Sequence, residues 1–171
     1  MAKETPFKLT YATMFNPPEE LHTRFEKALA QVKDNLGKEF SMFIDGGEKQ
    51  AADTFENFSP INTDMVLGIF QKGNAGDADA AVSAAKRAFP AWSALPWKDR
   101  LSLLRKAADI IDERIFEFAA VITLEVGKNR MEALGDAAEA ADLIRYACDQ
   151  IEANGGFIKK MGSDPLRGYQ A

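Results

Sequence analysis

Apolar residues recur at helical spacing in the first part of the chain, after an irregular arm over residues 1–16. Pro17 and Pro18 suit the first turn of a helix, and Gly37 is a plausible end, because glycine readily adopts a left-handed conformation. The apolar positions between them are Leu21, Phe25, Ala28, Leu29, Val32 and Leu36. This spacing predicts an amphipathic helix between Pro17 and Gly37.

The pattern then changes to short apolar stretches that are typical of strands. Residues 40–44, 54–58 and 65–71 are rich in Phe, Ile and Val, residue types that favour strands. The Asp45-Gly46-Gly47 segment is a turn signal, because glycine reaches positive φ at low cost. The first helix is therefore expected to lead into a small β-meander.

Helical spacing returns after Gly76 and continues over most of the remaining chain. Asp77 is a candidate N-cap, and Pro90 is expected to end the first of these helices. Its apolar face comprises Ala78, Ala81, Val82, Ala85 and Phe89. A second helical stretch runs from Pro96 to about residue 124, where Gly127 follows, with an apolar stripe of Leu101, Leu104, Ala108, Ile111, Ile115 and Phe118. A third helix is predicted from about Arg130 to Ala153.

The last residues read as the start of a hairpin. Phe157 to Met161 favours a strand, Ser163 to Gly168 a turn, and Tyr169 would open a second strand. A hairpin that ends inside its second strand leaves backbone groups unpaired. We therefore expect the chain to be part of a longer protein.

Composition excludes several classes of protein. The 171 residues are 46% hydrophobic and 27% charged, with a net charge of −5, values that suit one globular domain. No dense block of Lys and Arg indicates a nucleic-acid partner, and no apolar run approaches the ~20 residues that span a bilayer. The N-terminus has no signal-peptide pattern. These features predict a soluble cytoplasmic protein with no nucleic-acid or membrane partner.

The residues that usually carry chemistry do not form a catalytic set here. Cys148 is the only cysteine and shares a helical stripe with Leu134, Ala137, Ala141, Ile144 and Ile151, so we expect a buried apolar thiol and not a nucleophile. His22, the only histidine, is expected at the surface, and one histidine cannot form a zinc site. Gly73 to Gly76 lacks the pattern of a dinucleotide-binding turn. The sequence therefore predicts no catalytic, cofactor-binding or metal residue within this chain.

The third helix has a second face that carries acidic residues. At 100° per residue, Glu132, Asp136, Glu139, Leu143 and Tyr146 lie roughly opposite the Cys148 stripe. Glu139 would then sit beside Leu143 and Tyr146, where a carboxylate in a partly apolar setting can meet a ligand. The alternative is an ordinary solvated acidic face. The pattern alone leaves both interpretations open.

Five segments, taken together, resemble the aldehyde dehydrogenase family. They are FIDGGE at 43–48, NFSP at 57–60 with VLGI at 66–69, DAAVSAAKRAFPAW at 79–92, RLSLLRKAA at 100–108 and TLEVGK at 123–128. Ser59 departs from the usual Asn of the second segment. Each match is weak alone, but five in the family's order over residues 40–150 are specific. The first helix with GKEF at 37–40, EVGKN at 125–129 and AAEAAD at 137–142 with Tyr146 resembles the 1-pyrroline-5-carboxylate dehydrogenase branch.

This resemblance implies an α/β fold, represented here by its N-terminal helices and small β-meander. It divides the chain into an N-terminal arm and helix at 1–39, the first part of the NAD-binding domain at 40–155, and the start of an oligomerisation hairpin at 156–171. In the full-length enzyme a homo-oligomer would be expected.

The resemblance also implies an NAD- or NADP-dependent oxidation of a small aldehyde, L-glutamate γ-semialdehyde, to glutamate in proline breakdown. The family's nucleophile, general base and cofactor turn cannot be placed on residues 1–171, so the chain alone is expected to be inactive and to bind no cofactor. Glu139 matches the family's substrate-pocket glutamate. The alternative is a stand-alone helical interaction module derived from that family.

Overall fold

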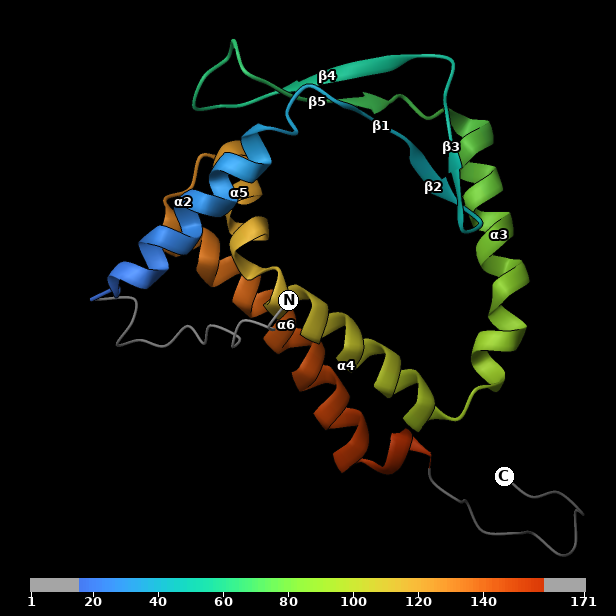
Figure 1. Cartoon of the computed structure of the whole chain (residues 1–171). Coiled ribbons are helices and arrows are strands. Elements are labelled where there is room, and N and C mark those ends of the chain that lie inside the picture. Colours follow the sequence, from blue (N-terminus) through green and yellow to red (C-terminus); the bar gives the residue numbers. More distant parts are fainter. Residues whose placement is uncertain (1–15, 159–171) are drawn as a thin grey trace, which may run out of the picture.

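A computed structural model describes residues 16–158 of the chain. The elements follow one another as α2 (Glu19–Lys33), β1 (Glu39–Phe40), β2 (Met42–Ile44), β3 (Gly47–Lys49), β4 (Thr54–Phe58), β5 (Val66–Gln71), α3 (Ala75–Ala94), α4 (Trp97–Glu113), α5 (Ile115–Val126), α6 (Arg130–Ala153) and a 3-10 turn, Gly155–Phe157. Figure 1 shows α2, α4, α5 and α6 gathered together, while α3 stands on the other side of the molecule. Helices and sheets occur together, as the predicted α/β class requires.

The strands form two small sheets, so the predicted β-meander is wrong. One sheet has the order β1-β5-β4, with β1 parallel to β5, and the other is the β2–β3 hairpin. The stretch predicted as one strand over 40–44 is divided at Ser41, which passes the chain from the first sheet to the second. The predicted turn is confirmed, since Asp45 and Gly46 have φ values of 58° and 76°. Both values suit the tight turn of a two-residue hairpin.

The start and end of α3 differ from the prediction. Asn74, not Asp77, is the N-cap: its side-chain oxygen accepts hydrogen bonds from the N–H groups of Gly76 and Asp77 at 2.8 and 3.2 Å. The Asp77 carboxylate accepts from the Asn74 N–H at 2.8 Å in return, which completes a capping box. The helix also continues through Pro90 to Ala94. Proline removes one hydrogen bond within a helix, and here that loss does not end it.

The other helix ends were predicted more closely. Gly127 ends α5 in the left-handed conformation, with φ of 79°. Asn129 then caps α6, because its side-chain oxygen accepts from the N–H groups of Met131 and Glu132, both at 3.0 Å. The helix spans Arg130–Ala153, as predicted. Phe157 ends a 3-10 turn, so the prediction of a strand that begins there is wrong. The part of the predicted hairpin beyond residue 158 lies outside the described residues, as do residues 1–15 of the arm predicted over residues 1–16.

The core lies where α2, α5 and α6 meet. Its buried residues are Leu21, Phe25 and Ala28 from α2, Ile115, Phe116, Ala119 and Ala120 from α5, and Ala133, Leu134 and Ala137 from α6. The many alanines allow the helix axes to approach closely, which keeps packing dense. On the other part of α6, α4 packs alongside, and Arg105 and Arg145 of these two helices form ion pairs with acidic residues across the contact. This packing fixes which face of α6 remains open.

Candidate functional site

The candidate site is the side of α6 that faces away from this core. The buried residues of α6 are Ala133, Leu134, Ala137, Ala141 and Cys148. Glu139, Leu143 and Tyr146 are exposed, Leu143 at 59% and Tyr146 at 62% of their surface. The predicted division of this helix into two faces is therefore confirmed. The setting of Glu139 within the described chain is open and not desolvated, so the choice between a ligand-facing and a solvated carboxylate stays a prediction.

Lys128 sets the charge around this face. It lies in the loop between α5 and α6, and its ammonium donates a hydrogen bond to the Asp136 carboxylate at 2.5 Å. That hydrogen bond raises the pKa of Lys128, and the charges of Asp136, Glu132 and Glu139 act in the same direction. Asp136 is thus paired within the chain. Among the residues that the structure describes, no hydrogen bond or ion pair engages Glu139, which leaves its carboxylate available to a ligand.

Cys148 is fully buried on α6, with 0% exposure, as predicted. A thiol without access to solvent or substrate cannot serve as a nucleophile. His22 differs from its prediction as a surface residue: it is half-buried where α2 meets α6. The Arg130 guanidinium contacts its Nδ1 at 3.1 Å, and because a guanidinium can only donate, Nδ1 is the acceptor. This contact is structural.

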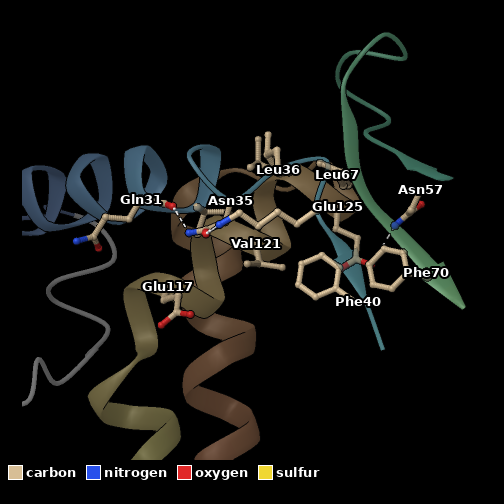
Figure 2. A pocket seen from close by; sticks show the side chains of 13 residues that line it. Gln31, Asn35, Leu36, Phe40, Asn57, Leu67, Phe70, Glu117, Val121 and Glu125 are labelled. Carbon is tan, nitrogen blue, oxygen red and sulfur yellow. Dashed lines mark hydrogen bonds between the residues drawn. The ribbon is translucent and has the colours of Figure 1, made fainter. Parts of the chain in front are cut away.

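A cavity that the sequence did not predict lies between the end of α2, the β1-β5-β4 sheet and α5 (Figure 2). Its volume is about 510 Å³. Apolar side chains line most of it: Val32, Leu36, Phe40, Leu67, Phe70, Val121 and Leu124. Phe40 and Phe70 stack with their ring centroids 5.3 Å apart. The lining comes from five elements far apart in sequence, so no local pattern could reveal it.

The two carboxylates that line this cavity have partners within the chain. Glu125 accepts a hydrogen bond from the Asn57 amide at 3.4 Å, and Glu117 is bound by the Arg114 guanidinium, which lowers the pKa of that carboxyl. The cavity also contains no thiol or histidine among its lining residues. We therefore assign it no catalytic role.

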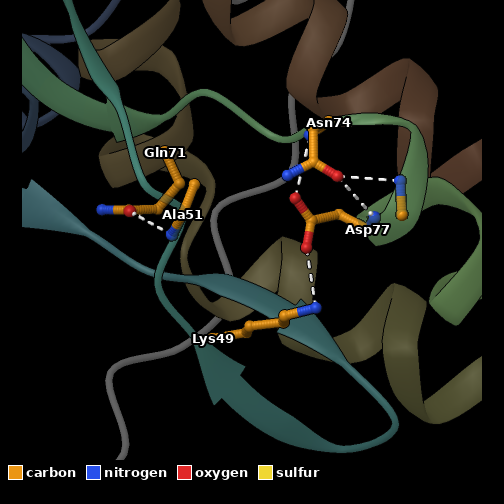
Figure 3. Close-up of polar contacts among 6 residues, drawn as sticks. Lys49, Ala51, Gln71, Asn74 and Asp77 are labelled. Atoms are coloured by element: carbon orange, nitrogen blue, oxygen red, sulfur yellow. Dashed lines mark hydrogen bonds and ion pairs between the residues drawn. The ribbon is translucent and has the colours of Figure 1, made fainter.

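A polar junction connects the β2–β3 hairpin to the start of α3 (Figure 3). The Lys49 ammonium lies 2.7 Å from the Asp77 carboxylate. Hydrogen bonds from Lys49 and from the Asn74 backbone hold the pKa of Asp77 below its ordinary value. Nearby, the buried Gln71 side chain accepts from the Ala51 N–H at 2.8 Å. These groups satisfy one another, so the junction serves the fold.

The turn before α3 does not provide a cofactor site. Phosphate-binding turns need free backbone N–H groups at a helix start, whereas the N–H groups of Gly76 and Asp77 are bound to Asn74. Within residues 16–158, no group of three or more His, Cys, Asp or Glu side chains is placed to hold a metal ion. None of the described helices has the length and apolar character needed to cross a membrane.

Sequence and structure comparisons both find 1-pyrroline-5-carboxylate dehydrogenases among the similar proteins. The chain is 39% identical over 141 residues to 1-pyrroline-5-carboxylate dehydrogenase of Staphylococcus haemolyticus, a match that covers 82% of this chain and 27% of the relative. The structure of the Thermus 1-pyrroline-5-carboxylate dehydrogenase with bound NAD superposes with a TM-score of 0.82 and 30% identity, over 96% of this chain and 32% of that one. A NAD-dependent aldehyde dehydrogenase of Sinorhizobium meliloti gives 0.68 and 30%, over 78% and 27%.

The chain spans about a quarter to a third of the length of these relatives. The sequence profile of the aldehyde dehydrogenase family matches residues 47–168, which is more than half of the chain. That range includes β3 to β5, α3 to α6 and Glu139. The chain belongs to the aldehyde dehydrogenase family.

Proposed function

We propose that this chain supplies the N-terminal part of an NAD-dependent aldehyde dehydrogenase that oxidises L-glutamate γ-semialdehyde to glutamate. The observation that carries the substrate assignment is the presence of α2 in the shared structure. The superposition on the Thermus enzyme leaves 4% of the chain uncovered, about seven of 171 residues. Helix α2 has 15 residues, so most of it must lie within the match.

The relatives differ in how much of the chain they match. The family profile begins at residue 47, after α2, and the Sinorhizobium aldehyde dehydrogenase covers 18 percentage points less of the chain than the Thermus enzyme, 78% against 96%. Leu21 and Phe25 of α2 are buried in the main core, so α2 is an integral element. The match of most of α2 to the Thermus enzyme therefore supports assignment to the 1-pyrroline-5-carboxylate dehydrogenase branch.

The chemistry of oxidation is not assigned to the described residues. Cys148 is buried, and the turn before α3 has its N–H groups engaged. The buried thiol therefore does not fit a nucleophile, and the turn before α3 does not fit a phosphate-binding turn. In the proposed enzyme, other parts of the protein would hold the nucleophile, the base and the cofactor. The enzyme would act on a small soluble aldehyde as a homo-oligomer.

We assign to Glu139 the binding of the substrate's amino-acid end. Its carboxylate is exposed, and among the described residues no hydrogen bond or ion pair engages it; the Lys128 ammonium, whose pKa its charge helps to raise, is hydrogen-bonded to Asp136. An ammonium group of the substrate could occupy this place and donate a hydrogen bond to the Glu139 carboxylate. A charge-assisted hydrogen bond of this kind is worth ~1.5–3 kcal/mol. The role of Glu139 is thus to orient the aldehyde, not to react with it.

A hybrid enzyme tests the function. Residues 16–158 would replace the matching segment of the Thermus enzyme, and NADH formation would be followed with glutamate semialdehyde. The hybrid is expected to fold, bind NAD and oxidise the semialdehyde. A hybrid that folds and binds NAD but prefers unrelated aldehydes would contradict the substrate assignment, and one that fails to fold would contradict the proposed role of the segment and favour a separate interaction module.

A further inference from the structure

No feature of the described chain requires glycine at position 135 of α6. Gly135 lies in the interior of the helix, between Leu134 and Asp136. Glycine weakens a helix interior more than any residue except proline. Its φ is not among the positive values that favour glycine, which occur at Gly37, Gly46, Gly127, Gly155 and Gly156. Backbone conformation therefore does not require it.

Packing does not require it either. A Cβ built on Gly135 meets nothing within 4 Å among the described residues. Gly68 is different, because a Cβ there would come within 2.8 Å of the Phe40 ring. Gly156 is different as well, because a Cβ there would approach the Trp97 ring to 2.6 Å. Those two glycines make room for aromatic rings of this chain, whereas the room beside Gly135 is unoccupied by it.

The open space lies next to the candidate site. Gly135 precedes Glu139 by one turn, so the two residues are about 40° apart around the helix and about 6 Å apart along it. Tyr146 falls on the same line, about 20° from Gly135, and is 62% exposed. Between Gly135 and Glu139, the Asp136 carboxylate is drawn toward Lys128 by their ion pair. No described atom occupies the position of a side chain at Gly135, although the Lys128 ammonium bound to Asp136 is near enough to interact with the charge of Glu139.

We propose that Gly135 is a specificity-determining residue: its missing side chain leaves the space in which the amino-acid end of an ω-semialdehyde lies against Glu139. This inference rests on the proposed function. The α-carbon of such a substrate carries both an ammonium and a carboxylate group, so it is bulky close to the charge that Glu139 binds. A short unsubstituted aldehyde has no such bulk and does not need the space.

The test compares Gly135→Ala and Gly135→Leu in the hybrid enzyme, with Ala107→Leu on the exposed side of α4 as the matched control. Glutamate semialdehyde and propanal are the two substrates, and thermal unfolding is measured for each variant. Gly135→Leu is expected to raise KM for glutamate semialdehyde at least about 10-fold, the scale of added methylenes in a specificity pocket. It should leave kcat/KM for propanal nearly unchanged and should not lower the melting temperature, since leucine favours a helix over glycine. For Gly135→Ala, KM for glutamate semialdehyde is expected to lie between those of the unsubstituted hybrid and of Gly135→Leu.

Three results would overturn the inference. Unchanged kinetics would mean that no ligand uses the space. A lower melting temperature with equal loss for both aldehydes would mean that protein atoms close on Gly135. If Ala107→Leu changes the kinetics as much as Gly135→Leu does, the added bulk acts nonspecifically. Failure of the proposed function is seen separately, because it appears as a lack of glutamate semialdehyde oxidation in the hybrid before any substitution at Gly135.

Discussion

The helices around α6 bury large apolar side chains in a core, whereas the region formed by the sheets and α3 leaves several of its own exposed. In α2, α5 and α6 large side chains such as Phe25 and Leu134 are 2% and 0% exposed. In the other region Phe43 is 71% and Phe89 65% exposed, and α3 buries only Asp77 and Ala84. The apolar face predicted for α3 is therefore present but uncovered within the described residues.

This contrast shows what each region needs in order to be stable. The first has a contiguous core of its own, which is the main source of stability in a small domain. The second is held by a few polar contacts, such as Lys49 with Asp77, and by the stacked rings of Phe40 and Phe70. In the proposed enzyme the exposed face of α3 would be covered by family elements outside this chain.

The largest expected effect separates the two regions by mutation. Leu134→Ala removes a fully buried side chain from the core and should lower the free energy of unfolding by ~2–5 kcal/mol. Val82→Ala, at a 54% exposed position of α3, should change it by less than about 0.5 kcal/mol. Urea unfolding followed by circular dichroism measures both. Equal losses would refute the division into a packed and an open region.

A second substitution tests whether the open region has any tight packing. Gly68→Ala places a methyl group 2.8 Å from the Phe40 ring and should cost ~1–3 kcal/mol through strain. The matched control is Gly47→Ala in β3, where the nearest atom is the Ile44 carbonyl oxygen at 3.9 Å. The same unfolding experiment compares the two. If Gly68→Ala costs no more than Gly47→Ala, the Phe40–Phe70 stack contributes little to the sheet.

Cys148→Ala probes the packed region more gently. The thiol is buried between α6 and its neighbours, and its loss should cost on the order of 1 kcal/mol and leave the activity of the hybrid unchanged. In the unmodified protein, a thiol reagent should label Cys148 much more slowly under native conditions than in urea. Rapid native labelling, or lost activity with stability intact, would mean that the thiol has a functional role.

The smallest effect concerns pH and the polar junction of the open region. The pKa of Asp77 is lowered by the Lys49 hydrogen bond, so its contribution to stability is present above the unfolded-state pKa, near 4, and is lost as pH falls through the lower folded-state value. Asp77→Asn should therefore be less stable than the natural chain at neutral pH, by an amount that shrinks below about pH 4. Unfolding at several pH values for both proteins checks this. A difference independent of pH would exclude the ion pair as the cause.

Local signals explain which parts of the fold were predictable. The end of α5 and the start of α6 follow from Gly127 and Asn129, residues that stop one helix and cap the next through contacts within four positions. The N-cap of α3 is also encoded locally, because Asn74 and Asp77 have capping-box spacing, and the prediction of Asp77 as the cap misplaced it by three residues. Pro90 shows that a helix can continue through a proline when the residues on both sides are helical.

Features that depend on distant partners were not predictable. The parallel pairing of β1 with β5 joins Glu39 to Ile69, and the contact of His22 with Arg130 spans 108 positions. The cavity beside Phe40 likewise draws on five elements. For the candidate site, periodicity correctly placed Glu139 on the open face of α6. Its ligand remains a prediction, because helical spacing specifies a face and not what binds there.

The most direct measurement of the central claim, that the open face of α6 meets the substrate, is the effect of Glu139→Gln on selectivity in the hybrid enzyme. The substitution keeps the shape of the side chain and removes its charge. We expect kcat/KM for glutamate semialdehyde to fall roughly 10- to 100-fold, with a much smaller change for propanal, which has no ammonium group. Glu132→Gln, on the same face near the start of α6, should affect neither. Unchanged kinetics for both aldehydes would show that Glu139 belongs to a solvated acidic face, and equal losses accompanied by lower stability would show that its role is structural.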